Sequence, residues 1–163
     1  MEAADRDAPL AKAIRTVFRL MKFRPRSEWE IVEKLKSRHL ASETISAALE
    51  YFKKLDYVDD HRFAKAWTAS RLIKIGINRI RLELKEKGIA KEIIQETLDH
   101  IPQEYSEIDS ILKIAQKRLS KYQNLDSVKS KRRLYEYLAR QGFQQSTIHK
   151  ALRQLFKKNH DHE

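Results

Sequence analysis

Basic side chains gather in the last third of the sequence, in a pattern that suits contact with phosphate. The cluster consists of Lys129, Lys131, Arg132 and Arg133, with Arg140 further along the same expected helix. At 100° per residue, Arg133 and Arg140 fall on one side of that helix. Tyr135 and Tyr137 lie within the cluster and offer rings on which nucleic-acid bases could stack. The alternative is a solvated basic face with tyrosines that pack inside the protein.

A second candidate for phosphate contact is a basic flank on the expected helix around Ile80. Arg81 and Lys85 lie on this flank, and no carboxylate of the same helix shares it. Arg79 lies on the other side, where Glu83 follows at i, i+4 and can pair with it. Arg81 and Lys85 are therefore the better candidates for binding phosphate.

Motifs for catalysis are missing from the sequence. The absence of cysteine removes thiolate nucleophiles and thiolate metal ligands. None of the six histidines shows H-E-x-x-H spacing, and no glycine-rich phosphate loop occurs. His160 and His162 are too few to hold a metal by themselves. We expect no enzymatic activity, no cofactor and no bound metal.

These residues are positioned by an internal repeat. Five apolar positions recur three times, first 49 residues later and then a further 54 residues later. The matched positions are Ile31/Ile80/Leu134, Leu35/Leu84/Leu138, Leu40/Ile89/Phe143, Ile45/Ile94/Ile148 and Leu49/Leu98/Leu152. Their spacing predicts a helix, a turn and a second helix in each copy. A repeat of this kind buries its apolar face by packing against its neighbours.

A further helix is expected before each pair. The first is defined by Ile14, Val17, Phe18 and Met21, and the second by Phe63, Ala66, Trp67 and Ser70 at the same offset of 49 residues. The third contains Ile108, Ile111, Leu112, Ala115 and Leu119. The predicted fold is all-α, with three tandem three-helix repeats at 9–58, 59–101 and 102–158. Residues 1–8 are expected to fray, and residues 159–163 to form a polar tail.

Capping residues support these helix ends. A capping box is predicted for Ser27 with Glu30, and other N-cap candidates are Ser42, Asp59 and Asp60. Left-handed residues that follow a helix are predicted at Gly88 and Gly142, with His39 in the corresponding place of the first repeat.

Composition agrees with a helical protein that meets nucleic acid. The chain of 163 residues has only three Gly and three Pro, whereas β-sandwiches and barrels need many such turn residues. Its net charge of +11 and pI near 9.8 are typical of nucleic-acid binders. No apolar run approaches the length of a membrane span or signal peptide. We expect a cytoplasmic protein without membrane association.

Three segments carry a resemblance to a known family. Tyr57-Val-Asp-Asp-His-Arg-Phe-Ala64, followed by Gly76-Ile-Asn-Arg-Ile-Arg-Leu-Glu-Leu-Lys-Glu-Lys-Gly-Ile89, resembles the signature of the RecX family. Arg24-Pro-Arg-Ser-Glu28 and Leu138-x-x-x-Gly-Phe143 resemble further parts of its pattern. The resemblance extends from about Leu10 to Leu155, and His39 departs from it where glycine is common.

The resemblance implies an elongated, curved array of three repeats that regulates the RecA recombinase. It implies binding in the groove of the RecA–single-stranded DNA filament, with inhibition of RecA's ATPase, strand exchange and coprotease activities. It also implies weaker contact with duplex DNA, roles in DNA repair, recombination and the SOS response, and no cofactor. We expect a monomer, because every apolar stripe has a neighbour within the array.

We expect the first repeat to face a protein partner, and the third repeat and the Arg81/Lys85 flank of the second to face nucleic acid. The candidates for RecA contact are Arg24, Arg26, Glu28, Glu30, Glu33 and Arg62. The candidates for DNA contact are Arg81, Lys85, Lys129, Lys131, Arg132, Arg133 and Arg140.

Two other functions share some of these features. A helix-turn-helix transcriptional regulator has the short turns and the basic charge, but it reads base edges from a recognition helix and usually dimerises. An α-solenoid that binds only protein has the same repeat pattern. Sequence-specific duplex binding favours the first alternative, and DNA-free capture of a partner at high salt favours the second.

Overall fold

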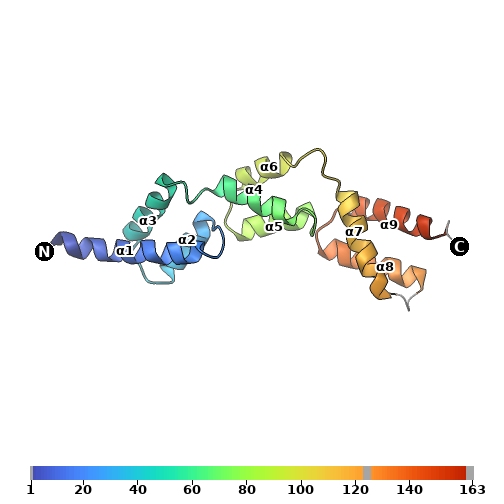
Figure 1. Cartoon of the computed structure of the whole chain (residues 1–163), viewed down its shortest axis with the longest axis horizontal. Coiled ribbons are helices and arrows are strands. Elements are labelled where there is room, and N and C mark those ends of the chain that lie inside the picture. Colours follow the sequence, from blue (N-terminus) through green and yellow to red (C-terminus); the bar gives the residue numbers. More distant parts are fainter. Residues whose placement is uncertain (1, 123–125, 161–163) are drawn as a thin grey trace. The chain divides into compact units, whose positions relative to one another are not determined.

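The structure is a computed structural model that describes residues 2–122 and 126–160, with side chains described for 8–122 and 126–157. Within these residues it contains nine α-helices, one short 3-10 helix and no strand, which confirms the all-α prediction (Figure 1). The helices are α1 (Glu2–Met21), α2 (Glu28–Lys36), α3 (Ser42–Lys54), α4 (Asp60–Arg71), α5 (Ile77–Glu86), α6 (Lys91–Asp99), α7 (Glu107–Leu119), η1 (Ser120–Tyr122), α8 (Ser127–Arg140) and α9 (Gln145–His160).

The structure describes only part of the two chain ends that were expected to fray or to form a polar tail. Helix α1 already begins at Glu2, within the segment 1–8 that was expected to fray, while Met1 lies outside the described residues. Helix α9 continues to His160, within the expected polar tail. Residues 161–163 of that tail, with His162, lie outside the described residues.

The chain divides into two compact units. Unit 1 comprises Met1–Ala66 and Leu84–Thr97, and unit 2 comprises Trp67–Glu83 and Leu98–Glu163. The helices α4, α5 and α6 therefore contribute residues to both units. Each unit has buried apolar side chains of its own.

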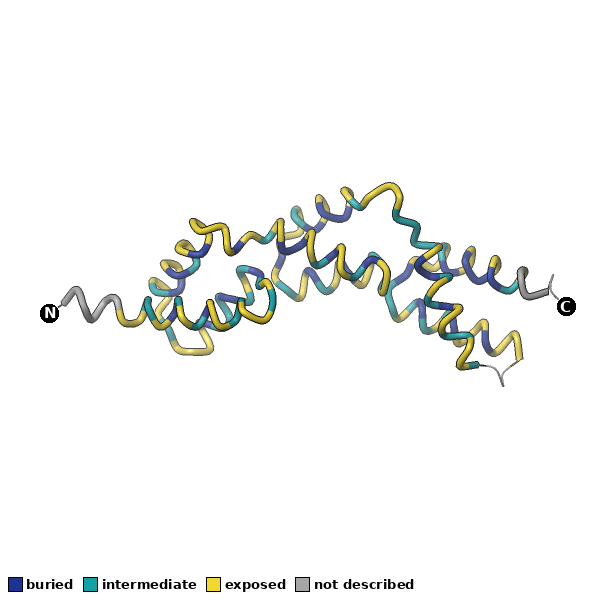
Figure 2. The backbone as a smooth tube through the Cα atoms, in the orientation of Figure 1, coloured by how far each residue is buried: buried dark blue, intermediate teal, exposed yellow. Residues whose placement is uncertain are grey.

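In unit 1, helices α1 and α2 both pack against α3. Their core contains Val17 from α1, Ile31 and Leu35 from α2, and Ile45 and Phe52 from α3. Four of these five side chains are fully buried. In the burial-coloured tube, buried residues recur at intervals along each helix, as expected for helices with one apolar side (Figure 2).

In unit 2, helix α9 packs against both α7 and α8. The core combines Ile111 of α7, Leu134 and Leu138 of α8, and Ile148 and Leu152 of α9. These side chains are at most 1% exposed. This core positions α8, which carries the predicted basic cluster.

Burial confirms the register of the repeat in the second and third helices of each group. Every residue of the five matched sets is buried, apart from Leu40 and Leu49, which are half-buried. In the first helix of the second group, α4, the predicted register was wrong. In α4, Ala66 and Ser70 are exposed, whereas Ala64 and Thr68 are buried. The connection to the next helix is 72–76 here but 22–27 in the first group, so the offset of 49 residues does not extend to α4.

Most of the predicted caps are confirmed. Ser27 and Glu30 form the capping box at the start of α2. The backbone angle φ is positive at Gly88, Gly142 and His39, with values of 73°, 83° and 57°. The prediction for Ser42 was wrong, because Ala41 is the N-cap of α3 and makes no side-chain cap bond.

The two aspartates at the start of α4, Asp59 and Asp60, accept different hydrogen bonds. The Asp59 carboxylate accepts a hydrogen bond from the Arg62 backbone N–H at 3.0 Å, which is the predicted cap of α4. The Asp60 carboxylate instead accepts from the backbone N–H of Glu28, the first residue of α2, at 2.9 Å. Burial raises the pKa of Asp60, although this hydrogen bond opposes the shift.

Equivalent close contacts join the middle helices of successive three-helix groups. In unit 1, the Ser27 hydroxyl donates to the carbonyl oxygen of Lys87, just after α5. In unit 2, the backbone N–H of Gly76, just before α5, donates to the carbonyl oxygen of Gln141 at 3.0 Å. Ser27 corresponds to Gly76, and Lys87 to Gln141, at the offsets of the repeat. Each contact brings the positive N-terminal end of one helix to the negative C-terminal end of another.

Candidate functional site

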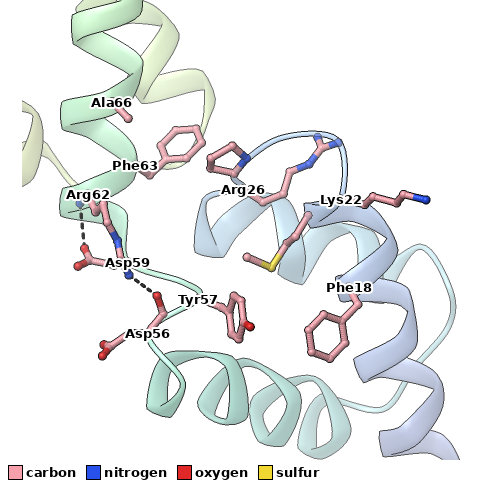
Figure 3. Close-up of a pocket in the computed structure, with 11 residues that line it drawn as sticks. Phe18, Lys22, Arg26, Asp56, Tyr57, Asp59, Arg62, Phe63 and Ala66 are labelled. Atoms are coloured by element: carbon pink, nitrogen blue, oxygen red, sulfur yellow. Dashed lines mark hydrogen bonds between the residues drawn. The ribbon is translucent and has the colours of Figure 1, made fainter.

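A hollow of about 490 Å³ opens in unit 1 between α1, α4 and the segments before α2 and α4 (Figure 3). It is lined by Phe18, Met21, Lys22, Pro25, Arg26, Asp56, Tyr57, Asp59, Arg62, Phe63 and Ala66. Two of these residues, Arg26 and Arg62, were predicted to contact a protein partner. The structure thus brings together two residues that are 36 positions apart in the sequence.

Aromatic rings form one wall of this hollow and are supported by the core. The rings of Phe18 and Tyr57 meet edge to face, with centroids 5.9 Å apart (Figure 3). Phe18 also packs edge to face on the fully buried Phe52 at 4.9 Å. Phe18 and Tyr57 remain 44% and 55% exposed. Sequence reasoning placed Phe18 on the apolar side of a helix, where an aromatic residue is normally assigned to the core, and singled out Tyr57 only as part of the family signature.

Polar groups surround this apolar wall. The Arg62 guanidinium donates to the backbone carbonyl oxygen of Asp56 (Figure 3). The hydrogen bond from the Arg62 backbone to Asp59 lowers the pKa of that carboxyl group. Within the described part of the chain, the exposed Lys22 forms no ion pair. The carboxylates of Asp56 and Asp59 line the hollow together with these cations, so its aromatic wall suits an apolar or aromatic side chain of a partner.

Beside the hollow, Glu30 is the centre of an ionic cluster. Its carboxylate accepts hydrogen bonds from Arg24 at 2.9 and 2.5 Å and from Lys87 at 3.0 Å. Arg26 lies 3.8 Å away. Burial by itself raises the pKa of Glu30, but the hydrogen bonds and positive charges of Arg24 and Lys87 outweigh it and hold the pKa at about 2.

The other acidic candidates for partner contact also have partners inside unit 1. Glu28 pairs with Lys53 at 2.7 Å, and Glu33 pairs with Lys36 at 2.9 Å. The side chain of Glu30 is only 11% exposed, whereas that of Glu33 is 44% exposed. Contact of these glutamates with a partner stays a prediction, and Glu30 is the least accessible of them.

The predicted DNA-contacting residues of α8 lie on its exposed surface. Lys129 pairs with Asp126 at 3.2 Å, and Arg132 lies 3.8 Å from Glu136. Lys131, Arg133 and Arg140 are exposed as well. On α5, Arg81 and Lys85 are exposed, and Arg79 lies 3.7 Å from Glu83 as predicted.

The two tyrosines of the basic cluster pack inside unit 2. Tyr135 and Tyr137 are half-buried against its core. The ring of Tyr135 lies 4.9 Å from that of His149. The Tyr137 ring lies beneath the guanidinium of Arg118, whose carbon is 3.6 Å from the ring centroid. Packing was the alternative to base stacking, and these contacts favour it.

Four basic residues of unit 2 were missed by sequence reasoning. Lys74, Lys117, Arg118 and Lys121 surround a second hollow together with Tyr137. Within α7 and η1, positions 114, 117, 118 and 121 follow the spacing i, i+3, i+4, i+7 of one helix face. That spacing could have indicated a basic helix face, but DNA contact was predicted for the denser cluster at 129–133 instead.

Neither a metal-binding cluster nor a membrane-spanning helix occurs in the described part of the chain. Across residues 8–122 and 126–157, no three His, Cys, Asp or Glu side chains gather in a way that could hold a metal ion. None of the helices in the same ranges is long and apolar enough to cross a membrane.

Comparison with known proteins gives the same identification in all three helical groups. The models of the first, second and third three-helix domains of RecX match residues 13–52, 59–98 and 105–152. The fold is similar to the crystal structure of RecX from Lactobacillus salivarius, with a TM-score of 0.75 and 19% identity. That similarity covers 90% of this chain and 96% of the other.

Curated relatives named regulatory protein RecX match over most of this chain. The one from Chlorobium phaeobacteroides is 34% identical over 148 residues, which are 90% of this chain and 95% of the relative. The one from Clostridium botulinum is 31% identical over 133 residues, and the chain spans only 60% of its length. These relatives are regulatory proteins and not enzymes, as predicted for this chain. The match across all three three-helix domains, with more than 30% identity over nearly the whole length of a relative, places the chain in the RecX family.

Proposed function

We propose that this protein regulates the RecA recombinase by binding the RecA–single-stranded DNA filament in the cytoplasm. The observation that carries the proposal is membership of the RecX family through all three three-helix domains. The binding inhibits RecA's ATPase, strand exchange and coprotease activities. It links the protein to DNA repair, recombination and the SOS response.

Two kinds of contact support binding to a filament of protein and DNA. The hollow of unit 1, with its aromatic wall and the cations Lys22, Arg26 and Arg62, contacts a side chain of RecA. The exposed cations of α5 and α8 contact DNA phosphate. The net charge of +11 favours a partner rich in phosphate. A monomer that uses both surfaces gains from simultaneous binding, because the second contact is made at a high effective concentration.

The test is a titration of the protein into RecA hydrolysing ATP on single-stranded DNA, from far below RecA's concentration up to equality. The affinity of the protein for bare DNA is measured in the same buffer. Inhibition at concentrations too low to coat the DNA supports direct action on the filament. Inhibition only when bare DNA is saturated means competition for the DNA. No effect on RecA, with tight binding to one duplex sequence, supports the transcriptional regulator instead.

A further inference from the structure

The second hollow lies wholly within unit 2 and has a volume of about 280 Å³. It is lined by Ile73, Lys74, Ile114, Lys117, Arg118, Lys121 and Tyr137. Lys74 lies in the segment between α4 and α5, Lys117 and Arg118 on α7, and Lys121 on η1. Among the described residues that line this hollow, none is acidic. It is therefore a strongly positive depression.

Its cations are not neutralised from within the protein. Within residues 8–122 and 126–157, no carboxylate forms an ion pair with Lys74, Lys117 or Lys121, and all three lysines are exposed. Arg118 donates from Nε to the Tyr122 hydroxyl at 3.2 Å, which leaves the charge of its guanidinium uncompensated. An anionic ligand can therefore approach these groups without displacing a carboxylate.

Two planar groups that line the hollow are stacked on each other. The Arg118 guanidinium lies over the half-buried Tyr137 ring, with 3.6 Å between its carbon and the ring centroid. Tyr137 contacts one face of this guanidinium, and the Tyr122 hydroxyl accepts a hydrogen bond from its Nε edge. A guanidinium held in this way offers its outer face to a base, because arginine planes and aromatic rings both stack on bases. Ile73, which is 66% exposed, adds an apolar edge.

We propose that this hollow binds one nucleotide of a single-stranded nucleic acid, with the base on Arg118 and Ile73 and the flanking phosphates on Lys74, Lys117 and Lys121. The proposal rests on the proposed function for the presence of DNA in the complex. It adds a specific DNA-contacting surface that includes none of the residues predicted from the sequence to contact DNA. Arg133 and Arg140 occupy the same side of α8 as Tyr137, at i−4 and i+3, so the strand can leave the hollow across them.

Single strands fit the hollow better than duplexes or small molecules. Base stacking on a platform requires an unpaired base, whereas a duplex offers only its phosphates to such a surface. The volume of about 280 Å³ lies at the lower end of the about 300–1,000 Å³ usual for pockets that bind whole small molecules. A ligand that continues beyond the hollow, as a polymer does, matches its size.

The test measures binding of a fluorescent oligothymidylate to the full-length protein over a range of salt concentrations. In the test variant, Lys117→Ala and Lys121→Ala remove two cations of the hollow. In the matched control, Lys150→Ala and Lys157→Ala remove two exposed lysines of α9 in the same unit. The proposal predicts that affinity falls about tenfold in the test variant only. The slope of log affinity against log salt falls by about 1.4, since each single-strand phosphate contact contributes about 0.7.

Two further measurements identify the ligand, and a third distinguishes failure of this proposal from failure of the proposed function. A duplex of the same length should lose less affinity than the single strand, and an oligothymidylate carrying 5-iodouracil should crosslink within the hollow. Equal losses in the two variants overturn the proposal, as does wild-type protein that fails to bind the oligonucleotide. RecA's ATPase is measured with the same variants. If RecA is still inhibited while the hollow proves irrelevant to DNA binding, the proposed function stands and the nucleotide site falls.

Discussion

The hydroxyl of Ser27 donates a hydrogen bond to the carbonyl oxygen of Lys87 at 2.6 Å, across 60 positions of sequence. The Ser27 hydroxyl oxygen also accepts a hydrogen bond from the backbone N–H of Glu30 at 3.2 Å, so one side chain both caps α2 and links it to the end of α5. Ser27 is fully buried. A single hydroxyl therefore joins the first two three-helix groups inside unit 1.

Replacing Ser27 by alanine should lower the free energy of unfolding by more than the loss of a helix cap alone. The matched control is Ser106→Ala, because Ser106 caps α7 with the same geometry, at 3.2 Å from the Asp109 N–H. Loss of the cap costs about 1 kcal/mol in either variant. Ser27→Ala also leaves the Lys87 carbonyl without its donor, for a total near 2 kcal/mol. Denaturant unfolding and amide exchange in α2 measure the difference, and equal losses would contradict the linking role.

Substitution of Gly76 by alanine should disrupt the equivalent contact in unit 2. A Cβ at this position would collide with the backbone of Gly142 and Phe143, which cannot move aside as a flexible side chain can. We expect a loss of about 2–3 kcal/mol and faster amide exchange at residue 76, whose N–H donates to Gln141. Unchanged amide exchange at residue 76 would show that the backbone segments at 76 and 141–143 can move apart without loss of stability.

Acid should weaken unit 1 through Glu30. Its pKa of about 2 in the folded protein lies below the ordinary value of 4.5. The stabilisation by its charge is complete above pH 4.5 and is lost as pH falls toward 2. Glu30→Gln removes the charge, so we expect a loss of about 2 kcal/mol at pH 7. The difference from wild type should narrow between pH 4.5 and 2.

The control for this measurement is Glu33→Gln. Glu33 lies on the same helix but is 44% exposed, and its pairing with Lys36 is a surface contact. Such pairs contribute little to stability. Denaturant titrations of the three proteins at several pH values provide the comparison. If the free energy of unfolding of both variants depends on pH in the same way, Glu30 is not the group responsible for the loss of stability in acid.

Tyr57 provides the test of the hollow in unit 1. Tyr57→Ala removes part of the aromatic wall, and Tyr51→Ala is its control. Both tyrosines are exposed and both meet the edge of Phe52, but only Tyr57 lines the hollow. We expect Tyr57→Ala to weaken inhibition of RecA's ATPase about tenfold, with unchanged affinity for bare single-stranded DNA. Equal inhibition by the two variants would exclude the hollow as the site of RecA contact.

Charge reversal on α8 tests the basic cluster. In the variant Arg132→Glu with Arg133→Glu, we expect affinity for single-stranded DNA to fall at least about tenfold and the salt slope to fall by about 1.4. The matched reversal of Lys150 and Arg153 on α9 changes the net charge equally and controls for long-range attraction. If both reversals act alike, overall charge and not contact at α8 governs binding.

The sequence by itself determined the helices and their repeat. Apolar residues such as Ile31 and Leu35 recur at helical spacing, and one buried side of a helix is enough to produce that pattern. The capping box of Ser27 and the left-handed turns at Gly88 and Gly142 are equally local, since each depends on residues only a few positions away. The family signature was also readable from the sequence, because it is a pattern of residue types.

Only the tertiary structure decided which distant residues meet. Ser27 reaches Lys87 and Lys74 joins Lys117 because helices pack, and no periodicity along the chain encodes those distances. The same packing surrounded Glu30 with cations from two helical groups and exposed the ring of Phe18. Burial and charge compensation are properties of the surroundings in space. The chemistry of both hollows therefore became visible only when the helices were placed together.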